Sequence, residues 1–169
     1  MRETIFSILL GFVCLTFWMW QIDDNNTGLA NERLKNAVNY AAHDASLQID
    51  KAEVGRGRVV FDTVSAEETF TKTLQDNLSL DVDLVPKRNT IFQDKFTVTY
   101  TDYIDDNDGV NYPYFYENNV FGIHHWIYGP AVIFAVEVPR PRAFNMNPRY
   151  NLVKWAVFEY PLPTFIRSY

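Results

Sequence analysis

The pattern of hydrophobic positions begins with an unbroken apolar segment close to the first residue. TIFSILLGFVCLTFWMWQI, residues 4–22, contains no charged side chain. As an α-helix that rises about 1.5 Å per residue, this segment would cross nearly the roughly 30 Å of bilayer hydrocarbon. Trp18 and Trp20 lie near its end, where membrane proteins carry interfacial aromatic residues. The pattern predicts a transmembrane anchor, residues 1–22, that contacts the lipid bilayer through residues 4–22.

Polar residues on either side of this segment predict its orientation. Arg2 precedes it, and Asp23 and Asp24 follow it. This arrangement favours a single pass through the cell membrane with a cytoplasmic N-terminus and an extracytoplasmic domain, residues 23–169. The segment ends in Trp-Met-Trp-Gln-Ile instead of a small-x-small cleavage site, so we expect an uncleaved anchor rather than a signal peptide. DDNNTG, residues 23–28, is rich in turn formers and predicts a break or kink before the next helix.

The next helical pattern, LKNAVNYAAHDASLQID, residues 34–50, has two apolar faces. One broad arc contains small and aliphatic residues: Ala37, Val38, Ala41, Ala42, Ala45 and Ile49. Tyr40 and Leu47 lie on nearly the opposite side. Two interpretations stay open. The arc packs on the protein's own sheet with Tyr40 and Leu47 at its margin, or the small residues let the helix pack closely against a second copy or a partner subunit. The second interpretation predicts an assembly interface of Val38, Tyr40, Ala41, Ala42, Ala45 and Leu47.

Shorter patterns follow this helix. RVVFDT, residues 58–63, predicts a short strand. Ser65-Ala66-Glu67-Glu68 predicts a capping box in which Ser65 and Glu68 satisfy the first amides of a second helix. In that helix Phe70, Leu74 and Leu78 recur at i, i+4 and i+8, which predicts one buried face.

The outer half of the chain turns to strand patterns. KFTVTYTDYI, residues 95–104, alternates and places Phe96, Val98 and Tyr100 on one face. PAVIFAVEV, residues 130–138, is continuously apolar like a central strand, and LVKWAVFEY supplies another strand. The proline-rich segment between them, residues 139–150, predicts a surface crossing. The order predicts an α+β fold: the N-terminal transmembrane helix, the Ala-rich helix, and a small, mainly antiparallel sheet with one further helix.

Composition and charge exclude several functions. The 169 residues suit one domain plus an anchor, and the net charge of −6 without any basic block argues against nucleic acid or anionic lipid as a main partner. The single cysteine, Cys14, lies inside the apolar segment, so no intrachain disulfide is possible and an inert thiol is expected.

Candidate catalytic residues are few. His124 and His125 are adjacent and would point to opposite faces of a strand, and His43 has no histidine or cysteine four residues away. No Gly-x-Ser-x-Gly, phosphate loop, dinucleotide fingerprint or His-Glu-x-x-His occurs. We therefore expect a protein that is not an enzyme and that has no metal site and no cofactor.

The acidic segment YIDDNDGVNY superficially resembles a calcium loop. With Gly109 as the sixth loop position, the first would be Ile104 and the twelfth Phe115, and neither side chain offers an oxygen. A hairpin turn on Asp108-Gly109 explains the same residues, and irregular calcium binding stays open.

NYPYFYENNVFGIHHWIYGP, residues 111–130, is unusually aromatic. Its side chains predict either core packing and hairpin cover or a ligand-binding surface of Tyr114, Tyr116, Trp126 and Tyr128. The second interpretation describes a single-pass, membrane-anchored binding module that recognises a glycan or peptide.

The order of an N-terminal span, a polar segment, the helix ANERLKNAVNYAAHDASLQID and a small outer α+β region resembles the TadE-like and pseudopilin-like pilus-assembly membrane proteins of bacteria, particularly of Gram-positive species. The resemblance covers mainly residues 5–50. It implies a membrane-anchored subunit of a pilus or secretion assembly that associates through the Ala-rich helix with protein partners or with itself, and that is not an enzyme.

Overall fold

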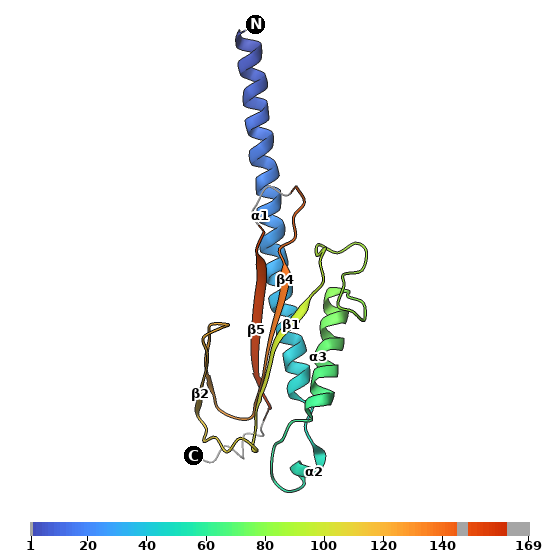
Figure 1. The fold of residues 1–169 in the computed structure, drawn as a ribbon, viewed down its shortest axis with the longest axis vertical. Helices are drawn as coiled ribbons and strands as arrows, with labels where there is room; N and C mark the ends of the chain where they lie inside the picture. The colour runs from blue at the N-terminus through green and yellow to red at the C-terminus, as the bar shows by residue number, and fades with distance from the viewer. Residues whose placement is uncertain (1, 145–148, 162–169) are drawn as a thin grey trace.

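The structure, a computed structural model, describes residues 2–144 and 149–161. Its helices are α1 (Arg2–Ser46), α2 (Lys51–Val54) and α3 (Thr63–Leu78). Its strands are β1 (Thr97–Ile104), β2 (Tyr114–Asn118), β3 (Ile123–Ile127), β4 (Ala131–Pro139) and β5 (Asn151–Glu159). The α+β class is confirmed: a long N-terminal apolar helix precedes a small antiparallel sheet and one further substantial helix (Figure 1).

Helix α1 is uninterrupted through the turn-forming segment, so the predicted break at residues 23–28 is wrong. Asp23 and Thr27 lie on the buried side of the helix, where they bond to a distant loop described below. The Asp23 carboxylate is therefore engaged in tertiary contacts, which reduces the competition with the helical backbone that makes such residues turn formers. The Thr27 hydroxyl accepts from Arg140 and donates to the Asp23 carbonyl one turn earlier at 2.8 Å, which is compatible with a continuous helix. The predicted domain boundary after residue 22 falls inside this helix.

The second half of α1 packs into the core along one stripe. The stripe repeats at three- and four-residue spacing: Asp23, Thr27, Ala30, Leu34, Ala37, Val38, Ala41, Ala42, Ala45 and Ser46. Helix α3 and the sheet cover it, and Phe70 of α3 stacks on Phe134 of β4 with ring centroids 3.9 Å apart. The predicted buried face of α3 is confirmed, since Phe70, Leu74 and Leu78 are all buried.

The main sheet has the order β1-β4-β5 and is antiparallel throughout. The prediction that residues 130–138 form a central strand is confirmed, because β4 is buried on both faces. Val132, Phe134 and Val136 face the helices. Ala131 and Ile133 face a second cluster, which the separate β2–β3 hairpin covers.

A β-bulge in β1 changes the predicted alternation. The register shifts between Val98 and Tyr100, so Val98 packs with the helix-facing core and Tyr100 with the opposite cluster. The prediction that Phe96, Val98 and Tyr100 share one face is therefore wrong at Tyr100. The extra residue of the bulge reverses the side on which later residues point.

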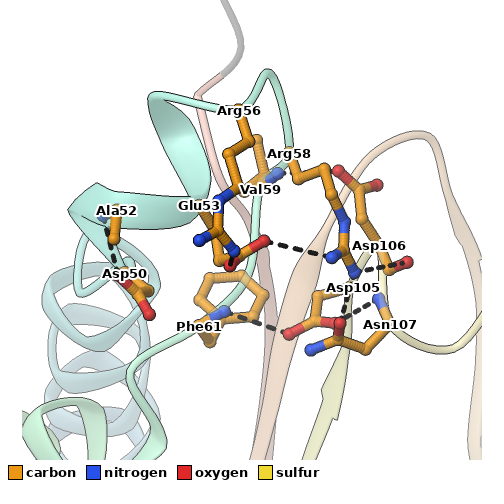
Figure 2. Close-up of polar contacts among 10 residues, drawn as sticks. All are labelled: Asp50, Ala52, Glu53, Arg56, Arg58, Val59, Phe61, Asp105, Asp106 and Asn107. Atoms are coloured by element: carbon orange, nitrogen blue, oxygen red, sulfur yellow. Dashed lines mark hydrogen bonds and ion pairs between the residues drawn. The ribbon is translucent and has the colours of Figure 1, made fainter.

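Residues 58–63 form no strand, contrary to prediction; only an isolated bridge joins Phe61 to Ile49. Acidic side chains take the backbone amides that a neighbouring strand would bind. Asp106 accepts from the Val59 amide at 2.6 Å, and Asp105 accepts from the Phe61 amide at 3.0 Å. Figure 2 shows these contacts beside Arg58, whose guanidinium also bonds to Glu53 at 3.0 Å.

The start of α3 differs from the predicted capping box. The helix begins at Thr63, and Asp62 is the N-cap, with its carboxylate accepting from the Ser65 amide at 3.1 Å. The Ser65 hydroxyl also donates to Asp62 at 2.7 Å. These bonds from the hydroxyl and the amide of Ser65 hold the pKa of Asp62 below its usual value.

The Asp108-Gly109 turn forms, with φ of 65° at Gly109, but it does not close a hairpin. β1 pairs with β4, and the turn leads instead into the β2–β3 hairpin. The predicted surface crossing after β4 begins with buried residues, Arg140 and Pro141; residues 145–148 lie outside the described chain.

Candidate membrane-proximal junction and assembly surface

The first half of α1 projects beyond the domain, and no described part of the chain covers it (Figure 1). Its large apolar side chains are each at least 48% exposed: Ile5, Phe6, Ile8, Leu9, Leu10, Phe12, Val13, Leu15, Phe17, Trp18 and Trp20. Among the described residues, α1 is the one helix long and apolar enough to cross a membrane. Such a surface is compatible with contact with a lipid bilayer.

A polar junction begins where this apolar segment ends. Asp23 is fully buried, and one of its carboxylate oxygens accepts from the amides of Ala143 at 2.7 Å and Phe144 at 3.0 Å. Arg140 donates through Nε to the Thr27 hydroxyl at 2.5 Å. The junction thus fastens the connection after β4 to α1, across more than one hundred residues of sequence.

The predicted assembly interface is divided between the core and the surface. Val38, Ala41, Ala42 and Ala45 are fully buried by α3 and the sheet. Tyr40 and Leu47 lie outside the core and are 61% and 41% exposed. The small-residue arc packs within the protein's own fold, against α3 as well as the sheet, as the first of the two interpretations predicts for the arc. The four buried residues therefore cannot contact another chain without opening the core.

A groove lies between the exposed side of α1 and strand β5. Its volume is about 460 Å³. Lys35 and Asn39 of α1 line one wall, His125 of β3 contributes to another, and Val153 and Trp155 belong to β5. A second hollow of about 380 Å³ shares Asn39 and extends past Tyr40 to His43 and Phe158. We call this combined surface the α1–β5 face.

Strand β5 brings an unpaired backbone edge to this face. Tyr160 donates its amide to Pro130, and Arg140 donates its amide to Tyr150, just beyond the two ends of the β4–β5 ladder. Because hydrogen-bonded and non-hydrogen-bonded pairs alternate in an antiparallel ladder, the even-numbered residues of β5 bond to β4. The backbone groups of Val153, Trp155 and Val157 consequently point toward the edge, where no described strand pairs with them.

The predicted aromatic ligand surface also divides. Tyr116 is 5% exposed, and its hydroxyl donates to Asp102 at 2.6 Å inside the cluster between hairpin and sheet. Burial is the largest cause that raises the pKa of Tyr116, and this hydrogen bond to Asp102 is the next. Tyr114 is half-buried on the same side. Trp126 and Tyr128 are 51% and 58% exposed, so two of the four residues belong to the interior.

The outward side of the β2–β3 hairpin carries an aromatic pair. Phe115 and Trp126 lie opposite each other in the ladder with ring centroids 5.0 Å apart, and Phe115 is 42% exposed. His124 shares this side and approaches Glu117 at 3.8 Å, whereas His125 faces the other way and lines the α1–β5 groove. The two adjacent histidines therefore occupy opposite faces, as their spacing predicts.

The described residues contain no cluster of three or more histidine, cysteine or acidic side chains arranged to hold a metal ion. In the acidic segment, Asp105 accepts from the amides of Phe61 and Asn107, and Asp108 accepts from the Asp105 amide at 2.8 Å. These carboxylates hold two loops together.

Sequence reasoning missed Asp23, Thr27 and Arg140. The available signal was a pair of polar residues four positions apart at the end of an apolar segment, together with an arginine that follows a buried strand.

No family model matches the chain, and neither the curated proteins nor the solved structures contain a match. The fold and the junction define the protein only as an α+β protein with one projecting apolar N-terminal helix.

Proposed function

We propose that the protein is a membrane-anchored, extracytoplasmic subunit of a pilus- or secretion-type assembly, and that it is not an enzyme. The observation that carries this proposal is the continuity of α1 from its projecting apolar half into the core of the domain. A single rigid helix joins the span to the domain, so neighbouring subunits that pack through their spans also set the positions of their domains.

The free energy gained by transferring the projecting half from water into a lipid bilayer supports the membrane anchor. Removing apolar surface from water stabilises by about 25 cal/mol per Å², and eleven large apolar side chains are exposed on this half of α1. Trp18 and Trp20 suit the membrane interface, and Asp23 and Asp24 suit the extracytoplasmic side.

The α1–β5 face is the surface through which we expect association. Trp155 and Tyr40 are exposed aromatic side chains, which often contribute most to interface energy. The unpaired edge of β5 offers backbone donors and acceptors to an added strand. The assembly interface that we propose therefore lies on the exposed side of α1 and not on the Ala-rich arc that the sequence predicted.

Cysteine crosslinking in the native membrane tests this proposal. In a Cys14→Ser background, Asn36→Cys and Tyr40→Cys place thiols on the α1–β5 face, and Val64→Cys, at a residue that is 68% exposed on α3, is the matched control. We expect crosslinks to a second copy or a partner at residues 36 and 40 but not at 64. Equal yields at all three positions, or none in folded protein, would contradict assembly through this face.

The Phe115–Trp126 pair favours a second candidate function, a membrane-anchored module that binds a glycan or peptide. Exposed aromatic rings in contact with each other are suited to such ligands. Under this alternative, Trp126→Ala abolishes binding of the glycan or peptide ligand, and Tyr40→Ala does not. If the protein acts by assembly, Tyr40→Ala instead weakens complex formation and Trp126→Ala does not.

A further inference from the structure

Three arginines gather beside the polar junction. A pocket of about 170 Å³ is lined by Arg140, Arg142 and Arg149, together with Asp94 and Tyr150. The segment between β4 and β5 supplies all three arginines, and the approach to β1 supplies Asp94. Three of the residues that line this pocket are arginines and one is acidic, and Asp24, which approaches Arg140, is a second carboxylate nearby, so the arginines leave a local excess of positive charge on a chain whose net charge is −6.

The three arginines are held differently. Only 5% of the Arg140 side chain is exposed; it is fixed by Thr27, lies 5.0 Å from the centre of the Tyr150 ring, and approaches Asp24 at 3.9 Å. The guanidinium groups of Arg142 and Arg149 make no hydrogen bond or ion pair with the described residues. One buried cation is therefore preorganised, while the other two retain their donors for a ligand.

With residues 4–22 across the bilayer, as proposed above, the pocket would lie at the depth of lipid headgroups. Thr27, which holds Arg140, is five residues beyond Ile22, or about 7.5 Å along the helix. The polar layer on each side of the hydrocarbon core is about 5–8 Å thick. In Figure 1 the described residues that directly follow β4 lie at the end of the domain nearest the projecting half of α1.

We propose that this pocket binds the phosphate diester of an anionic phospholipid. Arginine donates two parallel N–H groups to phosphate oxygens, and such charge-assisted bonds are stronger than neutral ones. Phe144 follows Arg142 of the pocket by two residues, is 40% exposed, and donates its amide to Asp23. Its ring offers an apolar contact to the acyl chains of the bound lipid. The inference rests on the membrane anchor of the proposed function, and it adds a specific lipid as a partner.

The test uses the full chain in neutral detergent micelles. Short-chain phosphatidylglycerol, short-chain phosphatidylcholine and inorganic phosphate are titrated separately, and the melting temperature is recorded. We expect phosphatidylglycerol to raise the melting temperature and phosphatidylcholine to leave it unchanged. The Arg142→Gln/Arg149→Gln variant should bind phosphatidylglycerol about tenfold or more weakly, because two charge-assisted donors are lost.

The matched control is Lys51→Gln/Lys72→Gln, which removes the same charge from exposed residues of α2 and α3. It should keep the response of the wild-type protein. An equal loss in this control, an unchanged response in the arginine variant, or a full response to inorganic phosphate alone would each overturn the lipid assignment. Insertion of the wild-type chain into pure phosphatidylcholine vesicles tests the anchor separately, so failure of the anchor and failure of the pocket give different results.

Discussion

At the scale of single residues, the most consequential position is Asp23. A buried carboxylate is costly unless hydrogen bonds compensate it, and here it terminates an apolar helical segment while holding the backbone of a distant loop. The sequence indicated an acidic residue flanking a membrane span, but its partners lie 120 and 121 residues away. No local pattern contains that information.

Asp23→Ala should lower the free energy of unfolding by about 1–3 kcal/mol, because the amides of Ala143 and Phe144 lose their buried acceptor. Chemical denaturation of the full chain in micelles measures the change. Asp24→Ala is the matched control, since that side chain is 79% exposed, and its effect should stay within about 0.5 kcal/mol. Equal effects of the two substitutions would contradict the role assigned to the junction.

At the scale of elements, the hydrophobic pattern predicted the type and the buried face of an element correctly where apolar side chains alone surround that element. The continuously apolar β4 and the spacing of Phe70, Leu74 and Leu78 were predicted because their neighbours are simply apolar. Prediction failed where a specific partner decides the outcome. Residues 58–63 have a strand-like composition, yet Asp105 and Asp106 bind their amides.

The interfaces were harder still to predict. An alanine-lined helix face looks the same whether its own sheet or another chain covers it, and only the fold assigned the arc to the core. Net charge likewise concealed the local gathering of Arg140, Arg142 and Arg149. Their placement depends on the junction with α1, which the sequence did not predict.

Ala41→Leu tests the assignment of the arc at this scale. Ala41 is fully buried in the core, so the larger side chain should lower the free energy of unfolding by about 1–3 kcal/mol through overpacking. Tyr40→Ala, one residue away and exposed, should change it by less than about 0.5 kcal/mol. Thermal or chemical denaturation compares the two variants. A domain that tolerates leucine at residue 41 without loss of stability would show that the arc is not packed as described.

At the scale of the whole molecule, the proposed assembly depends on the rigidity of α1. Gln21→Pro should kink the helix between the apolar half and the core, because proline removes one helical hydrogen bond and clashes with the preceding turn. We expect the crosslinks through Asn36→Cys to weaken strongly, while the unfolding of the domain, whose buried stripe starts at Asp23, changes little. Gln21→Ala is the control. Equal crosslinking in both variants would show that continuity of α1 is not needed.

Because α1 is uninterrupted, a tilt of its projecting half also tilts the whole domain. The part of α1 inside the domain, residues 23–46, extends about 36 Å. Membrane helices tilt by about 20° on average, and a change of that size would sweep the far end of this part of α1 sideways by about 12 Å if the helix stays straight. For the membrane anchor and the assembly proposed above, changes in bilayer thickness or in packing between spans would therefore displace the β2–β3 hairpin, with no conformational change inside the domain.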